Sequence, residues 1–204
     1  HTTGGAFTAD AVVVATSGAA SAELFQSHES LASRLRSVAS APLAVVHVAV
    51  PSAAPVPKDS FGVLFPSGAP DGLLGIMFKS SLFPHVAPEG NQLLTLCYGG
   101  RVFAAAHGAD FLTWSEESIA TMAAQALSRL LGVQGARLLH VERWTNAIPQ
   151  YELGHYKLRD EMAKFSASWP GIHFAGADTG GIGVPDRVEA GAQVAMRCLA
   201  IPQQ

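Results

Sequence analysis

The segment from Gly171 to Gly191 constrains this chain more than any other. A short apolar run, Ile172 to Ala175, leads into a glycine-rich stretch, and a helical pattern starts near Pro185. The segment predicts a buried strand, a tight turn and a helix, because proline fits the first helical turn, where its missing N–H costs nothing. Glycines let the backbone approach a ligand closely, and the helix N-terminus favours an anionic or electron-rich group. An ordinary βα turn fits the same pattern, so both interpretations stay open.

Hydrophobic periodicity predicts the elements of the first half of the chain. A continuous apolar run at 11–15 indicates a buried strand, and Leu31, Leu35 and Val38 share one face of a predicted helix. A loop rich in proline, alanine and serine follows at 51–57. The predicted helix covers 30–39, and the predicted strands cover 43–50, 61–66, 73–80 and 92–99, the last three as an antiparallel meander.

The second half contains three predicted helices. Thr113 and Glu116 have the spacing of a capping box, and Gly132 ends the helix that follows. A strand at 137–144 and a short helix at 155–167 lead into the glycine-rich segment. The first helix has a core-facing stripe of Ile119, Met122, Ala123, Ala126, Leu127, Leu130 and Leu131; the last is predicted to pack Val184, Val188, Ala192, Ala195 and Leu199 inward.

Composition excludes some classes of protein. With 49% hydrophobic and 14% charged residues, the chain can bury a sizeable core. No apolar run approaches the roughly 20 residues that a transmembrane helix needs, although the low charge leaves peripheral membrane association open. The net charge of −3 argues against nucleic-acid binding.

The cysteines and histidines do not predict a metal site. Cys97 and Cys198 lack zinc-ligand spacing and suggest no disulfide framework, which favours a reducing, cytoplasmic compartment. The histidines fall in separate elements and match no ligand motif. Besides His1, they stand at positions 28, 47, 85, 107, 140, 155 and 173.

Five blocks together resemble one family. Phe174 to Asp178, the Gly-x-Gly-Val-Pro-Asp run at 181–186 and Glu-Ala-Gly at 189–191 are similar to the C-terminal flavin-binding segment of the flavin amine oxidase superfamily. The other blocks resemble the protoporphyrinogen and coproporphyrinogen oxidases within it. They are Phe61–Ser67, Leu74–Gly90, Leu93–Gly100 and Arg143–His155, and they occur in the family's order over most of the chain.

The resemblance implies an α+β or α/β fold in two parts. Residues 1–40 and 146–204 correspond to pieces of a Rossmann-like FAD-binding domain, and 41–145 to a substrate domain with a mixed, largely antiparallel sheet and packed helices. The family's N-terminal Gly-x-Gly-x-x-Gly fingerprint is not found. We therefore expect the C-terminal half of a longer enzyme, completed by its N-terminal half or a partner chain.

The resemblance also implies an activity. It is the oxidation of protoporphyrinogen IX or coproporphyrinogen III to the porphyrin in haem biosynthesis, with non-covalent FAD that oxygen reoxidises. FAD would supply the chemistry, so no residue is predicted to be catalytic. We expect the isolated chain to hold FAD weakly or not at all and to be inactive. Another flavin amine oxidase-type oxidoreductase, a non-catalytic module that binds a tetrapyrrole or a protein partner, and a homodimer all stay open.

Six residues lie at or beside cofactor-binding positions of the family. The family often carries an acidic or amide residue where this chain has Ala177, and the placement at Asp178 resembles the amine oxidase pattern instead. Asp178 could accept hydrogen bonds from the ribityl hydroxyls, or it could cap the glycine turn. Gly183 and Val184 open the helix whose dipole would stabilise negative charge on the flavin ring. Trp144 corresponds to a tryptophan near the flavin, with a large core residue as the alternative. The set is Trp144, Gly176, Ala177, Asp178, Gly183 and Val184.

Three residues correspond to positions that line the family's tetrapyrrole cavity. They are Leu64, Met77 and Cys97, and they suit a flat apolar ring, which needs apolar walls. Alternating core residues of a sheet would give the same pattern. Cys97 stands where the family carries a bulky Phe or Met, which would widen the pocket. Arg101 is a weaker candidate for pairing with a propionate.

Overall fold

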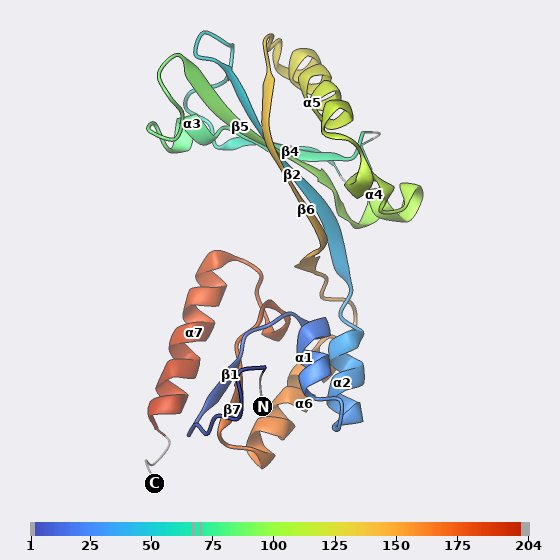
Figure 1. Cartoon of the computed structure of the whole chain (residues 1–204), viewed down its shortest axis with the longest axis vertical. Coiled ribbons are helices and arrows are strands. Elements are labelled where there is room, and N and C mark those ends of the chain that lie inside the picture. Colours follow the sequence, from blue (N-terminus) through green and yellow to red (C-terminus); the bar gives the residue numbers. More distant parts are fainter. Residues whose placement is uncertain (1–2, 67, 70, 201–204) are drawn as a thin grey trace. The chain divides into compact units, whose positions relative to one another are not determined.

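The computed structural model describes residues 3–66, 68–69 and 71–200. The chain forms two compact units: unit 1 joins the residues up to Ala39 to those from Pro149 on, and unit 2 is Ser40–Ile148 (Figure 1). The sequence-based boundaries stood at 40 and 145. Ser67, in the block Phe61–Ser67, lies outside the described residues.

Unit 2 is built on a five-stranded sheet, as far as the described residues show, with the order β3-β4-β5-β2-β6. The predicted meander is confirmed, because β3, β4 and β5 pair antiparallel, and β2 pairs antiparallel with β5. The strands are β2 (Ser40–Pro51), β3 (Gly62–Leu64), β4 (Leu73–Met77), β5 (Asn91–Gly99) and β6 (Arg137–Pro149).

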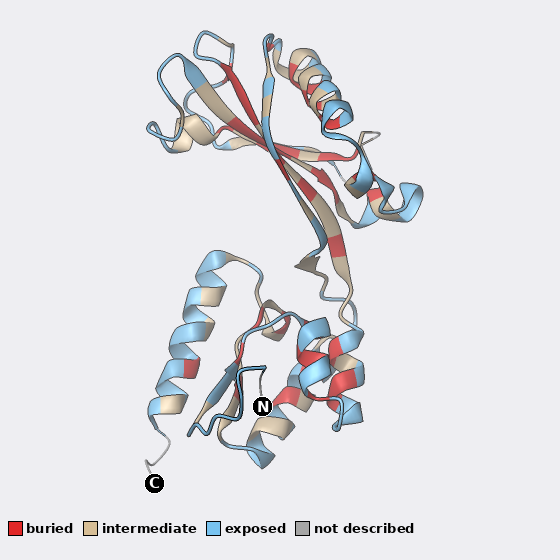
Figure 2. Ribbon diagram, in the orientation of Figure 1, coloured by how far each residue is buried: buried red, intermediate tan, exposed pale blue. Residues whose placement is uncertain are grey.

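One face of this sheet forms the core of unit 2 with helix α5 (Glu116–Leu131). Val46 and Val48 of β2 pair with Leu96 and Leu94 of β5, and all four are at most 1% exposed. Figure 2 shows buried residues, in red, along these strands and on α5. The predicted stripe of α5 is confirmed: Ile119, Ala123, Ala126 and Leu127 are buried, and Met122, Leu130 and Leu131 pack against the same core.

The predicted capping box of α5 is wrong. Thr113 belongs to a 3-10 turn, η1 (Asp110–Thr113), in which its hydroxyl donates to the Asp110 carbonyl at 2.7 Å. Ser115 is the N-cap instead, and its Oγ accepts from the Ser118 N–H at 3.2 Å. The helix end is as predicted, because Gly132 takes the left-handed conformation with φ of 68°.

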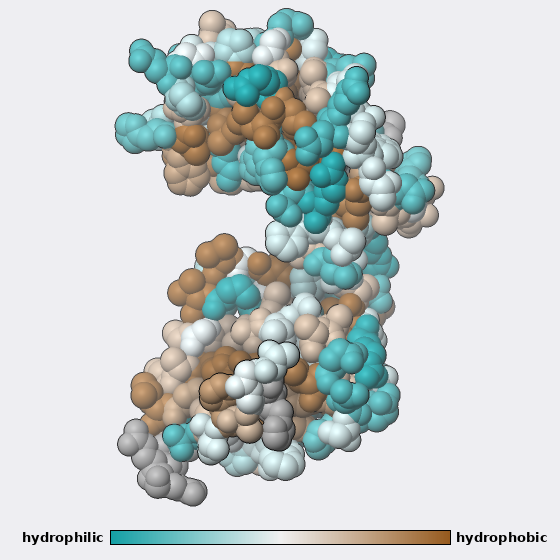
Figure 3. All heavy atoms as spheres, in the orientation of Figure 1, coloured by the Kyte–Doolittle hydropathy of each residue, from teal (hydrophilic) through white to brown (hydrophobic). Residues whose placement is uncertain are grey.

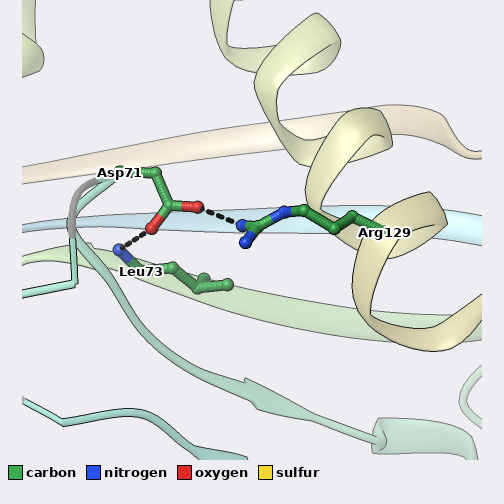
Figure 4. Close-up of polar contacts among 3 residues, drawn as sticks. All are labelled: Asp71, Leu73 and Arg129. Carbon is green, nitrogen blue, oxygen red and sulfur yellow. Dashed lines mark hydrogen bonds and ion pairs between the residues drawn. The ribbon is translucent and has the colours of Figure 1, made fainter.

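An ion pair fastens α5 to the loop before β4. Arg129 Nη2 donates to Asp71 Oδ2 at 2.8 Å, and Asp71 Oδ1 accepts from the Leu73 N–H at 3.2 Å (Figure 4). The Arg129 side chain is 65% exposed, so the pair orients the loop more than it stabilises the fold.

Unit 1 contains two parallel strands, β1 (Val12–Val14) and β7 (Ile172–Phe174), among its described residues. Its apolar cluster joins Val14 and Phe25 to Leu31, Leu35 and Met162. Only Val14 of β1 is buried, whereas Val12 and Val13 are 50% and 47% exposed, so β1 is not the fully buried strand predicted. The helices are α1 (Gly18–Leu24), α2 (Glu29–Arg36), α6 (Tyr156–Ser168) and α7 (Val184–Leu199).

The predicted packing of α7 is wrong. Val184, Val188 and Leu199 are 77%, 68% and 86% exposed, Ala192 and Ala195 are also exposed, and only Val194 is buried. Figure 2 shows α7 almost wholly exposed, and Figure 3 shows hydrophobic side chains along it. An apolar stripe predicts a buried face only if something covers it, and no described residue of unit 1 covers this one.

Other predicted bounds shift or miss elements. The helix expected at 30–39 is α2, and the chain already enters β2 at Ser40. The strand expected at 73–80 ends at Met77, and α3 (Lys79–Leu82) begins two residues later. Helices α1 and α4 (Gly100–His107) had no prediction, since their small or mixed residues give no clear apolar stripe.

Candidate functional site

The carboxyl ends of the two parallel strands bring the glycine-rich loop to the start of α1. Val14 pairs with Phe174, and the Ala175 N–H donates to the Val14 carbonyl at 2.9 Å. A Cβ on Gly176 would lie 2.7 Å from the Thr16 carbonyl, so only glycine allows this approach. Ligands of α/β sheets bind at this edge.

Arg187 of α7 holds the loop from within. Its Nη1 donates to the Ala175 and Gly176 carbonyls at 3.2 and 2.5 Å and to Thr179 Oγ1 at 3.2 Å. Its Nη2 donates to the Gly180 carbonyl. The guanidinium therefore satisfies loop carbonyls that no strand can pair.

Tyr151 supports the same loop from the other side. Its hydroxyl donates to the Ala177 carbonyl, and its ring stacks on His155 with a centroid distance of 4.3 Å. Ala177 itself begins the short 3-10 turn η2 (Ala177–Thr179). The predicted position Ala177 thus takes part in the site through its backbone.

Asp178 is 4% exposed and points to the first turn of α1. Its carboxylate accepts from the Gly18 N–H, 160 positions earlier in the chain, and from its own N–H. Burial raises the pKa of the Asp178 carboxyl, while these two N–H groups and the nearby His155 and Arg187 act in the opposite direction. Asp178 therefore binds the N-terminus of α1, and the remaining lone pairs of its carboxylate can accept hydrogen bonds from a ligand.

We expect Asp178→Asn to alter the pH dependence of stability. Because the folded-state pKa is raised, the ionised form is disfavoured in the folded chain. The contribution of the protonated Asp178 carboxyl to the unfolding free energy is therefore complete below the unfolded-state pKa of about 3.9. It is lost as the pH rises through the folded-state pKa. The amide removes this decrease, so the unfolding free energy of the variant minus that of the wild type should increase with pH. Urea unfolding of both proteins between acid and neutral pH measures this difference, and a constant difference would contradict the expectation.

The first turn of α7 presents N–H groups next to the loop. The Asp186 carboxylate accepts from the Gly183 N–H at 3.0 Å, and Pro185 has no N–H. The N–H groups of Val184 and Asp186 lack an acceptor within the helix because of their position. Gly181, with φ of 77°, leaves no room for a side chain, since a Cβ would lie 2.5 Å from Asp186. The turn thus exposes backbone donors to a ligand.

The three predicted wall residues lie on one face of the sheet of unit 2. Leu64 pairs with Gly75, Gly75 with Cys97, and Met77 with Thr95, so the alternation of strands places all of them on the side opposite the core. The prediction that Leu64, Met77 and Cys97 share a face is confirmed. We call this side the open face.

The open face is not a packed core. Leu64 is 88% exposed, and Met77 and Cys97 are half-buried. The alternative that Leu64 is an alternating core residue is therefore wrong. Burial raises the pKa of the Cys97 thiol, and the charge of Lys79 acts in the opposite direction. Cys97 thus stays a neutral, small apolar group at ordinary pH.

Trp144 and Arg101 also belong to unit 2. Trp144 is 52% exposed on β6, which rules out the alternative of a core residue. Its neighbour Arg143 donates to the Trp114 carbonyl at 3.1 Å, next to the core, so alternation turns Trp144 to the open side. Arg101 is exposed in the first turn of α4, beyond the end of β5.

The predicted residues thus fall into two groups. Gly176, Ala177, Asp178, Gly183 and Val184 meet in unit 1, and Leu64, Met77, Cys97 and Trp144 belong to unit 2. Sequence reasoning missed Arg187, Tyr151 and His47. An arginine four residues after the helix-opening Gly183 was the available signal for Arg187.

The described residues contain neither a metal-ligand cluster nor a membrane-spanning helix. In residues 3–66, 68–69 and 71–200, no group of three His, Cys, Asp or Glu side chains is arranged to hold a metal ion. Over the same ranges, no helix has the length and apolar character needed to cross a membrane.

The sequence model of the family described as flavin containing amine oxidoreductase matches residues 1–199. Human protoporphyrinogen oxidase is 30% identical over 94% of this chain and 40% of its own length. Coproporphyrinogen III oxidase of Bacillus subtilis (strain 168) is 26% identical over 90% of this chain and 38% of its own length. The chain therefore spans about two fifths of the length of these relatives.

Solved structures share the fold. A protein from Exiguobacterium sp. 255-15, named as a candidate protoporphyrinogen oxidase, superposes with a TM-score of 0.71 at 20% identity, over 94% of this chain and 41% of that one. Reduced UDP-galactopyranose mutase gives a TM-score of 0.63 at 12% identity, over 82% of this chain and 35% of that one.

Proposed function

Because the chain belongs to the flavin containing amine oxidoreductase family, we propose that it is part of an FAD-dependent oxidase that acts on a porphyrinogen. The names of the relatives support the substrate class, since they include protoporphyrinogen and coproporphyrinogen oxidases. The chain spans about two fifths of their length, so the activity is proposed for the protein that contains it.

The glycine-rich loop would hold part of the flavin without a covalent bond. The backbone N–H groups at the start of α7 suit the electron-rich edge of the ring, because the helix dipole is positive there. Asp178 suits the ribityl hydroxyls as an acceptor, although its carboxylate also binds the Gly18 N–H. Arg187 and Tyr151 would keep the loop in this shape through its carbonyls.

These groups fit the cofactor chemically. The loop offers backbone donors and one buried carboxylate, and glycine at 181 and 183 removes side chains from the approach. When bound, FAD would supply the two-electron oxidation itself. The residues of this chain would bind, orient and shield the reactants.

The open face of unit 2 would contact the substrate. Leu64, Met77 and Cys97 form an uncharged wall on one side of a sheet, which suits the flat apolar ring of a porphyrinogen. Trp144 turns to the same side of the sheet and would add an aromatic surface.

The observation that carries the proposal is the glycine-rich loop, which meets the start of α1 at the carboxyl end of parallel strands in a chain of this family. The test is to express the full reading frame that contains this chain, and the chain itself. We expect the full protein to carry the visible absorption band of FAD and to produce porphyrin fluorescence from protoporphyrinogen IX or coproporphyrinogen III in the presence of oxygen. We expect the 204-residue chain to hold FAD more weakly.

Two results would contradict the proposal. A full protein that retains no flavin would exclude the cofactor. A flavin-loaded protein that oxidises primary amines but neither porphyrinogen would point to another branch of the family.

A further inference from the structure

The open face of unit 2 has a basic edge beside its apolar wall. Met77 pairs with Thr95, and Thr95 pairs with His47, so these three lie in one row across the sheet. The His47 ring stacks on that of His140 on β6, with a centroid distance of 6.3 Å and an angle of 13°. Cys97 and Val45 form the neighbouring row.

Lys79 belongs to the same edge. Lys79 opens α3, directly after the buried Phe78 and two residues after Met77 of the apolar wall. The charge of Lys79 lowers the pKa of both His47 and Cys97, which indicates that the ammonium is near both side chains. The ammonium lies 5.9 Å from the centre of the Phe83 ring.

No described carboxylate forms an ion pair with Lys79. Glu142 is occupied by His140, whose Nε2 lies 3.3 Å from Glu142 Oε2. Lys79 is half-buried, so its charge is less screened than that of an exposed lysine. A partly desolvated ammonium beside an apolar wall favours an anion that is itself attached to an apolar body.

His47 supplies a second donor but little charge. Burial lowers the pKa of its imidazole, and His140 and Lys79 lower it further. Its Nδ1 lies 2.9 Å from Thr95 Oγ1, and Nε2 has no hydrogen-bond partner among the described residues. A neutral imidazole with Nε2 protonated can therefore donate to the same anion that Lys79 attracts.

We propose that Lys79, assisted by His47, binds a carboxylate of the substrate while the apolar ring lies on the wall of Leu64, Met77 and Cys97. This rests on the proposed function, because it assigns the polar end of the same substrate. The sheet would then recognise two features of the ligand, its flat apolar ring and a carboxylate at a fixed distance from that ring.

The test is a titration of the purified full protein that contains this chain with coproporphyrin III, followed by porphyrin fluorescence, and in parallel with its uncharged tetramethyl ester. Lys79→Gln should weaken binding of the acid about tenfold, since a hydrogen bond to a charged group is worth roughly that factor or more. The ester should bind the wild type and the variant equally. Lys79→Arg should restore most of the affinity for the acid.

Lys164→Gln is the matched control, because Lys164 is an exposed lysine on α6 of the other unit. It should bind the acid like the wild type. The thermal unfolding midpoint of each variant shows that the fold is kept.

Two outcomes separate the inference from the function on which it rests. Equal binding of the acid by wild type and Lys79→Gln would overturn the role of Lys79 and leave the porphyrin site standing. Failure of the wild type to bind either porphyrin would count against the site itself, and the assignment of Lys79 would fall with it.

Discussion

Replacing Arg187 with alanine is expected to destabilise unit 1 by about 1–3 kcal/mol, the usual cost of leaving a polar group that is shielded from water without a partner. The guanidinium donates to the carbonyls of Ala175, Gly176 and Gly180 and to the Thr179 hydroxyl. No other described group donates to the Gly180 carbonyl. Urea unfolding measures the loss, and cleavage of the glycine-rich loop by a protease should become faster.

Arg197→Ala is the control for this experiment. Arg197 lies on the same helix, but its Nε donates to the Gln193 carbonyl within that helix at 3.4 Å. Its removal should change stability by less than about 0.5 kcal/mol, as for other surface substitutions. Similar losses for both variants would mean that α7 as a whole, and not the arginine at 187, holds the loop.

Leu127→Ala is expected to destabilise unit 2 by about 2–5 kcal/mol, the usual range for a buried leucine. Leu127 is fully buried at 0% exposure between α5 and the sheet, among Val46, Leu94 and Leu96. The lost methyl groups leave a cavity that strands paired on both sides cannot easily close. Denaturant unfolding followed by tryptophan fluorescence measures the effect.

Leu64→Ala provides the matched comparison. Leu64 is the same residue type in the same unit, on strand β3, but is 88% exposed. Leu64→Ala should lower the unfolding free energy by less than about 1 kcal/mol, because the Leu64 side chain buries little apolar surface on folding. A cost near that of Leu127→Ala would mean that the open face is covered, which would contradict its assignment as a ligand surface.

The elements that depend on local periodicity could be predicted from the sequence. The stripe of α5 and its end at Gly132 were predictable, because side chains three and four apart share a helix face and glycine tolerates the left-handed turn. The common face of Leu64, Met77 and Cys97 was predictable as well, since alternation along paired strands leaves only two sides.

The contacts between residues far apart in the sequence became visible only in the tertiary structure. Asp178 caps a helix that begins 160 positions earlier, and Arg187 satisfies carbonyls of a loop that it follows, neither of which leaves a periodic trace. The apolar stripe of α7 read as a core face, yet it is exposed. Hydrophobic periodicity shows which side chains share one face of a helix or strand. Whether that face is buried depends on which other residues pack against it. The pairing of β2 with β5, likewise, is what brings His47 to the edge that Lys79 shares.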